Sequence, residues 1–258
     1  MNPADVIDAL ELPPGARVDR RVPKTLLVEH GAPTAADKRR INEGIEAVQW
    51  VATLKPTTIG VPAVHEEVRE YLEIAVLCVA LRAEAKVERL TELIHRAVPY
   101  PVFLMVAEGT RLTLSLAHKR WSQGEAGVTV LDGDPVAAML MESDQGGTVS
   151  SFYEALSLAR QPRADLYRLY QGWIDTLLAL LAARVTGVFA VATSPEEAAT
   201  RREALRECVL LDAEIARLRT TAAKEKQMPR QVALNLEVKR AEAARAAALA
   251  RLRRMRNS

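Results

Sequence analysis

Two stretches near the carboxyl end carry apolar residues at alternating spacings of four and three, the pattern of a helix that packs along a second helix. The first stretch consists of Ala204, Cys208, Leu211, Ile215, Leu218 and Ala222. The second consists of Leu234, Val238, Ala241, Ala248, Leu252 and Met255, with Arg245 in one position of the stripe. A short break that contains Pro229 separates them. The pattern predicts an antiparallel coiled-coil hairpin over residues 194–256.

The start of this hairpin carries a local signal. Ser194 is a good N-cap, Pro195 suits the first helical position, and Glu197 stands at the third. The stripes are rich in alanine, which predicts close but weakly stabilised pairing, so we expect the hairpin to dock on the rest of the chain or on a partner. Arg245 either sets the register of the pairing or marks where the two helices stop packing.

The first part of the chain alternates strand-like and helix-like stretches. The strongest strand signal is the nearly continuous apolar run Tyr71–Leu81, which is typical of a strand covered on both faces. A helix over 86–97 and strands over 101–107, 112–116 and 127–131 follow. This order predicts an α+β fold with a mixed or antiparallel sheet and packed helices, followed by a helical C-terminal part.

Further elements are expected on both sides of this core. Towards the N-terminus we predict a helix over 3–10, a strand over 20–28, an amphipathic helix over 35–53 and an edge strand over 57–64. Towards the C-terminus we predict helices over 151–160 and 164–184 and a short strand over 188–191. Gly146-Gly147 and Ser150-Ser151 indicate a joint. We therefore expect a sheet domain over 1–148 and a helical region over 149–258.

Charge is unevenly distributed along the chain. The net charge is +2, but residues 224–258 contain ten basic and three acidic side chains and carry +7, which leaves −5 on the rest. A basic tail on a mildly acidic body suggests an anionic partner such as nucleic acid. The plainer interpretation is a solvated helix end, whose arginines complement the C-terminal dipole.

Two further basic pairs stand close together in sequence, one at the end of an expected helix and one at the end of an expected strand. Together with the tail they form the predicted nucleic-acid-binding set: His95, Arg96, Lys119, Arg120, Arg251, Arg253, Arg254 and Arg256. Lysine and arginine at such ends are good phosphate ligands. The alternative is that His95 and Arg96 complement a helix dipole while Lys119 and Arg120 form a solvated strand end.

Motifs that would indicate an enzyme are missing from the sequence. It has neither a phosphate-binding glycine loop nor a serine nucleophile elbow, and its four histidines and two cysteines lack metal-ligand spacing. Asp132 and Asp134 flank Gly133, which fits a turn better than a metal site. Cys78 lies inside the apolar run and is expected to be a buried structural thiol. We therefore predict no catalytic residue, metal or cofactor.

One catalytic alternative stays open, a metal-dependent nuclease with an unrecognised active site. Glu84-Ala85-Lys86 follows the predicted strand at Tyr71–Leu81, and Glu73 lies within that run. Carboxylates and a lysine around a divalent ion can support such chemistry. The same three residues also make a plain connection from a strand to a helix. The nuclease interpretation requires Glu73, Glu84 and Lys86 to converge in one cleft.

Several segments resemble an uncharacterised family of bacterial proteins of about this length. The most specific are the HRAVPYP stretch at 95–101 and the SLAHKR stretch at 115–120. The family is a domain of unknown function whose members are often encoded beside DNA methyltransferases and helicases in restriction-like, anti-phage islands. The resemblance implies an accessory role in a DNA-targeting defence system, with a helicase or methyltransferase subunit as partner. It implies no catalytic residues.

The sequence therefore predicts a cytoplasmic, non-catalytic accessory subunit of a defence complex, which binds a partner protein and, as a further partner, nucleic acid. It has no signal-peptide pattern at its N-terminus and no apolar stretch of the ~18 residues that a membrane span needs. A structural protein that self-associates through the hairpin is a third interpretation. The identity of the partner, DNA or RNA as ligand, and the oligomeric state stay open.

Overall fold

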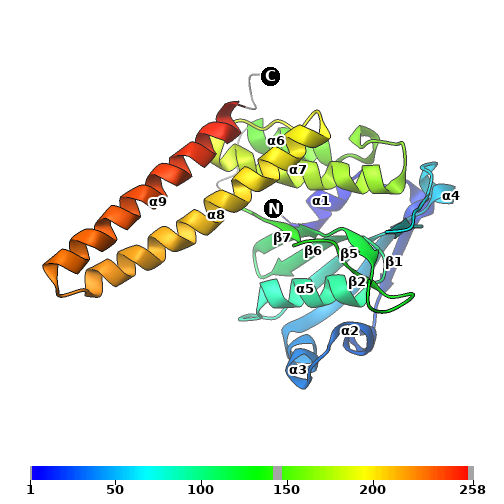
Figure 1. Cartoon of the computed structure of the whole chain (residues 1–258). Coiled ribbons are helices and arrows are strands. Elements are labelled where there is room, and N and C mark those ends of the chain that lie inside the picture. Colours follow the sequence, from blue (N-terminus) through cyan, green and yellow to red (C-terminus); the bar gives the residue numbers. More distant parts are fainter. Residues whose placement is uncertain (1, 142–146, 255–258) are drawn as a thin grey trace. The chain divides into compact units, whose positions relative to one another are not determined.

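The structure is a computed structural model that describes residues 2–141 and 147–254 (Figure 1). It divides into two compact units, Met1–Leu177 and Leu178–Ser258. The first unit contains all the strands described, and the second contains two long helices. The division between the two compact units falls within helix α7 (Leu166–Thr186). The domain boundary expected after residue 148 stays a prediction.

The first unit is built on a six-stranded mixed sheet with the order β1-β2-β5-β6-β7-β10. Its strands are β1 (Arg17–Arg21), β2 (Ile45–Leu54), β5 (Ile74–Leu81), β6 (Val102–Glu108), β7 (Arg111–Leu116) and β10 (Val136–Leu140). Only the β5–β6 pair is parallel, and the other neighbours are antiparallel. Two small sheets pair β3 (Val64–His65) with β4 (Glu70–Tyr71) and β8 (Lys119–Trp121) with β9 (Thr129–Leu131). The predicted α+β class with a mixed sheet is confirmed.

Helices of the first unit precede, connect and follow these strands. They are α1 (Pro3–Ala9), α2 (Lys24–Gly31), α3 (Ala35–Gly44), α4 (Pro56–Ile59), α5 (Val87–Ala97), α6 (Gly147–Leu156) and the first part of α7, with 3₁₀ turns at Pro14–Ala16 and Leu158–Arg160. Helix α5 is the crossover between the parallel strands β5 and β6, and it lies with α2 on one face of the sheet (Figure 1).

The central strands are covered on both faces. On one face, Leu77 and Val79 of β5 pack with Leu93 and Ile94 of α5. On the other face, Phe103 of β6 meets the Trp173 ring edge-on, with ring centroids 5.2 Å apart. This double burial explains the nearly continuous apolar sequence of β5. The strand expected in Tyr71–Leu81 is therefore confirmed, although β5 itself begins at Ile74.

The helix expected over 35–53 is wrong in its second half. Helix α3 ends at Gly44, and Ile45–Leu54 is strand β2. Two register shifts in the pairing of β2 with β5 interrupt the strand's two-residue alternation, so buried side chains recur at Ile45, Val48 and Val51. A bulge inserts one extra residue between two buried positions of a strand, so their spacing increases from two to three. A spacing of three between buried residues also occurs in helices.

Other short elements also differ from expectation. Strand β1 ends at Arg21, and most of the strand expected over 20–28 is helix α2, whose Leu27 is buried against the α5 side of the sheet. Most of the edge strand expected over 57–64 is occupied by α4 and the loop after Gly60, whose φ of +66° ends that helix. Residues 188–191 form no strand, and β8 and β10 were not expected.

The second unit contains the predicted hairpin. Helix α8 (Pro195–Lys224) and helix α9 (Met228–Arg254) pack against each other across the connection 225–227. Ser194 caps α8 by accepting a hydrogen bond from the Glu197 backbone N–H at 3.2 Å. Pro229 lies in the first turn of α9 rather than in the break. Proline is tolerated there because the backbone N–H groups of the first turn have no acceptor within the helix.

The hairpin seam consists of two apolar clusters. One joins Ala204, Cys208, Ala248 and Leu252, and the other joins Ile215, Leu218, Val238 and Ala241. Arg245 stands between them in sequence and binds the Asp212 carboxylate at 2.5 Å. The helices continue to pack beyond Arg245 in both directions, so this arginine does not mark the end of the pairing. Met255 lies outside the described residues.

Candidate functional site

Lys119, one of the predicted phosphate ligands, is a core residue. Its side chain lies inside the first unit with 1% exposure. The ammonium donates hydrogen bonds to the backbone carbonyls of His95 and of Val98, the latter at 2.7 Å. These carbonyls belong to the last turn and C-cap of α5, where a cation complements the helix dipole. Burial lowers the pKa of Lys119 to about 8.

His95 is also buried and lies on the inner face of α5. Its Nε2 is 2.9 Å from the hydroxyl oxygen of Ser115 on β7, and its Nδ1 has no hydrogen-bond partner among the described residues. Burial, with a smaller contribution from the Lys119 charge, lowers the pKa of His95 to about 3, so the ring is neutral near pH 7. Neither His95 nor Lys119 reaches the surface, and in this structure neither can contact a phosphate.

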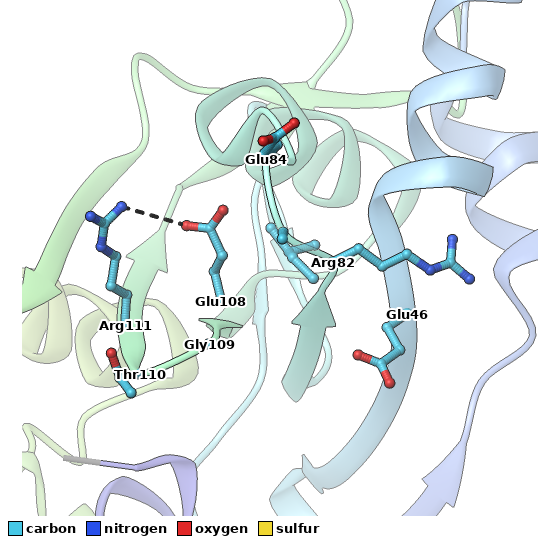
Figure 2. A pocket seen from close by; sticks show the side chains of 9 residues that line it. Glu46, Arg82, Glu84, Glu108, Gly109, Thr110 and Arg111 are labelled. Carbon is cyan, nitrogen blue, oxygen red and sulfur yellow. Dashed lines mark ion pairs between the residues drawn. The ribbon is translucent and has the colours of Figure 1, made fainter.

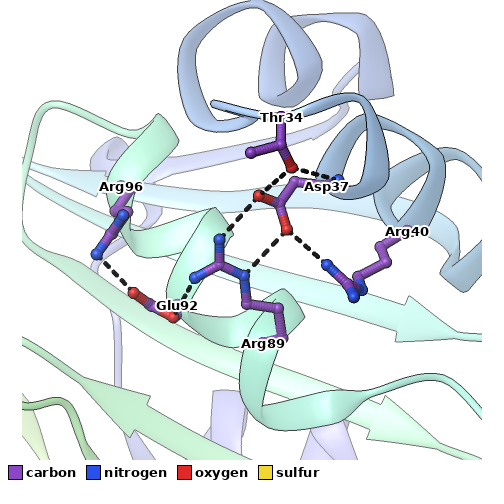
Figure 3. A network of polar contacts seen from close by, with 6 residues as sticks. All are labelled: Thr34, Asp37, Arg40, Arg89, Glu92 and Arg96. Carbon is purple, nitrogen blue, oxygen red and sulfur yellow. Dashed lines mark hydrogen bonds and ion pairs between the residues drawn. The ribbon is translucent and has the colours of Figure 1, made fainter.

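Arg96 lies at the outer end of an ion-pair network between α3 and α5 (Figure 3). Its guanidinium is 2.7 Å from Glu92, which also pairs with Arg89 at 2.7 Å. Arg89 in turn binds the buried Asp37 carboxylate through two hydrogen bonds of 2.8 and 3.0 Å. Arg96 therefore has a local acidic partner, and a phosphate would have to compete with Glu92 for it.

Asp37 is the centre of that network. Besides Arg89, its carboxylate accepts hydrogen bonds from the Thr34 hydroxyl at 2.8 Å and from Arg40 at 2.9 Å. Thr34 is the N-cap of α3. The Arg89 guanidinium, with help from Thr34 and Arg40, holds the pKa of Asp37 well below its usual range. This network fastens the start of α3 to α5, which is a structural role.

Arg120 follows Lys119 on β8 and is half-buried. Its guanidinium donates a hydrogen bond to the Trp121 carbonyl at 3.1 Å and lies 3.8 Å from the Asp132 carboxylate. Asp132 begins the turn that contains Gly133, whose φ is +86°. A turn was the favoured interpretation of Asp132-Gly133-Asp134, and the conformation of Gly133 agrees with it.

The predicted tail residues differ in their accessibility. Arg251 forms an ion pair with Glu207 across the hairpin. Arg253 and Arg254 are exposed and have no ion pair within the part of the chain that the structure describes. Arg256 lies outside the described residues. Arg253 and Arg254 are therefore the members of the predicted set whose charges are both exposed and unpaired there.

The three residues of the nuclease alternative do not converge. Glu73 precedes β5 and pairs with Lys55 at 2.9 Å, whereas Glu84 and Lys86 follow the other end of that strand. A strand of eight residues spans about 26 Å at ~3.3 Å per residue. Within residues 2–141 and 147–254, no group of three or more His, Cys, Asp and Glu side chains could hold a metal ion.

An open hollow of about 760 Å³ lies where β5 and β6 end (Figure 2). Its charged lining comes from Glu46, Arg82, Glu84, Glu108 and Arg111. Arg111 lies 3.9 Å from Glu108, and Arg82 donates hydrogen bonds to the carbonyls of Asn42 and Glu43. The hollow therefore has mixed charge, and its arginines already interact with neighbouring groups.

Sequence reasoning missed a partly buried polar chain between β4, the residue before β8 and α7. The Tyr71 hydroxyl lies 2.6 Å from His118 Nδ1, and His118 Nε2 lies 2.8 Å from the side-chain oxygen of Gln171. The Gln171 amide donates to Asp175 at 2.8 Å. An amide oxygen only accepts, so Nε2 of His118 carries a proton. Of these hydrogen-bonded side chains, only His118 lies in a segment that the sequence had singled out, the SLAHKR stretch at 115–120.

The hairpin exposes large apolar side chains. Val209 and Leu210 on α8 and Met228, Val232 and Leu236 on α9 are each more than half exposed. The hairpin therefore buries one stripe of each helix in its seam and leaves other large apolar residues accessible to a partner.

A search of protein families found a match over residues 10–244 to a family described as a domain of unknown function (DUF4391). The chain belongs to the DUF4391 family. The resemblance to an uncharacterised family is thus confirmed at this level. Searches of curated proteins and of solved structures found no significant match to this DUF4391 chain. Among its described residues, no helix is long and apolar enough to cross a membrane.

For this DUF4391 protein, the geometry separates the predicted basic set into three groups. His95 and Lys119 maintain the packing of α5, and Arg96 and Arg120 are engaged with nearby acids. The arginines at the end of α9 and the apolar side chains of the hairpin are the accessible features. Exposed apolar residues and a basic helix end are features commonly found on surfaces that contact macromolecules.

Proposed function

We propose that this chain is a non-catalytic accessory subunit of a cytoplasmic, bacterial, DNA-targeting defence complex of the restriction-like, anti-phage kind. In this complex it binds a helicase or DNA methyltransferase subunit. The observation that supports the proposal is the hairpin, in which α8 has 30 residues and α9 has 27. Its seam includes alanines at 204, 241 and 248, and it leaves large apolar side chains exposed, as protein-binding elements do.

Nucleic acid is the second proposed ligand, contacted through the arginines at the end of α9. Arg253 and Arg254 are exposed, and the chain from 224 onward carries a net positive charge. Phosphate contacts of this kind give affinity that falls steeply with salt and depends little on base sequence.

Co-purification tests the protein partner. The tagged full-length chain would be expressed together with the proposed partner, a helicase or a DNA methyltransferase subunit from the same organism, and purified at moderate salt. The proposal expects at least one of these subunits to co-elute in a fixed ratio. A chain that elutes alone, and that also fails to retain DNA, would contradict the accessory role.

A salt titration tests the nucleic-acid part. With a mixed-sequence DNA duplex, the Arg253→Ala/Arg254→Ala variant should bind more weakly and with a shallower salt dependence. The logarithmic slope should fall by about 0.9 for each phosphate that the variant no longer neutralises. Arg20→Ala/Arg21→Ala on the edge strand β1 removes the same charge elsewhere and is the matched control. Equal effects of the two variants would show that net charge, rather than the end of α9, determines binding.

The alternative activity has a direct assay. Supercoiled plasmid DNA incubated with the purified chain and Mg²⁺ should remain intact if the subunit is non-catalytic. Metal-dependent cleavage that follows the protein through purification would overturn the proposal in favour of a nuclease.

A further inference from the structure

Two ion pairs between α8 and α9 define the two sides of the hairpin seam. On one side Arg219 of α8 binds Glu242 of α9 at 2.6 Å. On the opposite side Glu207 of α8 binds Arg251 of α9. In an antiparallel pair of helices, each side of the seam is flanked by equivalent heptad positions of both helices, so these two ion pairs fix which positions share a side.

Four of the five large apolar residues that are exposed on the described part of the hairpin lie on the side of Arg219 and Glu242, with Val209 towards the open end and the other three near the connection 225–227. Counting heptads from the buried seam places Val209 of α8 and Val232 of α9 on this side, beside Met228 and with Leu236 at the outer edge. Their exposed fractions are 68%, 53%, 68% and 52%. On α9 the stripe is continued by alanines at 243, 246 and 250. We call this surface, with its central Lys239, the Val232 face.

The opposite side of the hairpin has a different character. Its positions are charged residues of both signs together with small residues: Glu203, Glu207, Glu214, Arg217, Lys224, Arg230, Glu237, Arg240, Arg251 and Arg254, with alanines at 233, 244 and 247. Leu210 is the one large apolar residue there that is exposed among the described positions of the hairpin. The two sides therefore differ in apolar surface.

The charges of the Val232 face are unbalanced. Its acids, Asp212 and Glu242, already pair with Arg245 and Arg219 of the hairpin itself. Arg202, Lys239 and Arg253 on the same face have no ion pair among the described residues. Two copies of the chain joined through this face would bring these cations together, which disfavours self-association. An acidic partner would neutralise them.

We propose that the Val232 face binds one amphipathic helix of a partner protein, whose apolar stripe is flanked by aspartate and glutamate. The helix would lie along α8 and α9 and complete a three-helix bundle. The apolar stripe would cover Val209, Val232 and Leu236, and the acids would meet Lys239 in the middle of the face and Arg202 and Arg253 at the open end of the hairpin. The proposal rests on the proposed function, because it assigns the surface through which the accessory subunit holds its partner.

A pair of synthetic peptides tests the chemistry. Each is a helical peptide of about four heptads with leucine at the core positions. One carries glutamate and the other lysine at the flanking positions. Fluorescence anisotropy with the full-length protein should show the glutamate peptide binding at least about tenfold more tightly, because like charges face each other in the lysine complex. Added salt should narrow the difference.

Two neighbouring substitutions test the location. Val209→Glu places a charge on the Val232 face, whereas Leu210→Glu places the same charge on the other side at an exposed fraction of 62% instead of 68%. The first should weaken binding of the glutamate peptide at least about tenfold, since it puts a carboxylate in the apolar contact, and the second should leave it unchanged. Circular dichroism confirms that both variants keep their helices.

Several outcomes would overturn this assignment. They are equal binding of the two peptides, equal losses in the two variants, and a homodimer in light scattering that Val209→Glu dissociates. The test of the Val232 face and the test of the accessory role can fail independently. If a helicase or methyltransferase subunit co-purifies with Val209→Glu as well as with the unchanged chain, the accessory role stands and the assignment of the Val232 face as the binding surface is wrong. If no such subunit co-purifies but the glutamate peptide binds as described, the face stands and the named partners are wrong.

Discussion

Replacing the buried Lys119 by methionine should remove a specific pH dependence of stability from the first unit. The folded-state pKa of Lys119 is about 8, against an ordinary value of 10.5. Between these two pH values the unfolded chain holds a proton that the folded chain has lost, so the stability of the unchanged protein rises with pH. The shift corresponds to about 3 kcal/mol in total. This gain in stability is absent below pH 8 and complete above pH 10.5.

Two opposing effects determine the result at neutral pH. The methionine variant loses hydrogen bonds from a charged donor to the carbonyls of His95 and Val98, worth about 1.5–3 kcal/mol each. It also avoids the cost of keeping an ammonium away from water, about 3 kcal/mol by the same pKa shift. The expected net loss at pH 7 is therefore only about 0–3 kcal/mol. The difference between variant and unchanged protein should grow by about 3 kcal/mol as the pH rises to 10.5.

Urea unfolding followed by tryptophan fluorescence measures this difference. All three tryptophans, Trp50, Trp121 and Trp173, belong to the first unit, so the signal reports on that unit. Comparing variant and unchanged chain at each pH cancels the titration of all other groups. Lys38→Met on α3, an exposed position, is the matched control and should show no such change. A difference that stays constant between pH 7 and 10.5 would refute the burial of the Lys119 ammonium.

Two other perturbations have defined outcomes. Asp37→Asn should destabilise the first unit at pH 7, because it removes the charged acceptor that joins Arg89 to α3. The pKa of Asp37 is lower in the folded than in the unfolded chain, so the ionised carboxylate stabilises the fold above pH 4. This stabilisation is lost as the pH falls further. Tryptophan fluorescence during urea unfolding at pH 7 and in acid should therefore show a difference that shrinks in acid. Arg245→Leu should stabilise the hairpin by about 1 kcal/mol, since it joins the two apolar clusters and leaves Asp212 in water. Thermal unfolding of the full chain by circular dichroism measures the effect, with the exposed Arg240→Leu as control, and a lower midpoint for Arg245→Leu would contradict the reasoning.

The hairpin could be predicted because its determinants are local. The Ser194 cap acts on the next three residues, and the apolar seam residues from Ala204 to Ala222 recur every three or four positions. The matching seam of α9 follows after a short break. Strand β2 could not, because its period depends on how it pairs with β5. The bulges that create the misleading spacing of Ile45, Val48 and Val51 exist only in the assembled sheet.

The basic candidates show a second limit of sequence reasoning. Lys119 and Arg120 are adjacent and equally basic, yet one is fully buried and the other half-exposed. What buries Lys119 is the end of α5, whose carbonyls at His95 and Val98 lie more than 20 positions earlier in the chain. No local pattern indicates that distant acceptor, so a strand-end lysine looks the same whether it faces a phosphate or a helix terminus.

The basic residues of the sheet unit and those of the hairpin differ in the same way. In the first unit, the predicted cations are satisfied by groups of the fold itself: helix carbonyls for Lys119, Glu92 for Arg96 and Asp132 for Arg120. A phosphate there would have to replace an existing partner, and the gain would be small. On the hairpin, Lys239 and Arg253 lie exposed beside apolar side chains without an acid among the described residues. Their charges are available, so an acidic ligand would not have to displace an existing partner there.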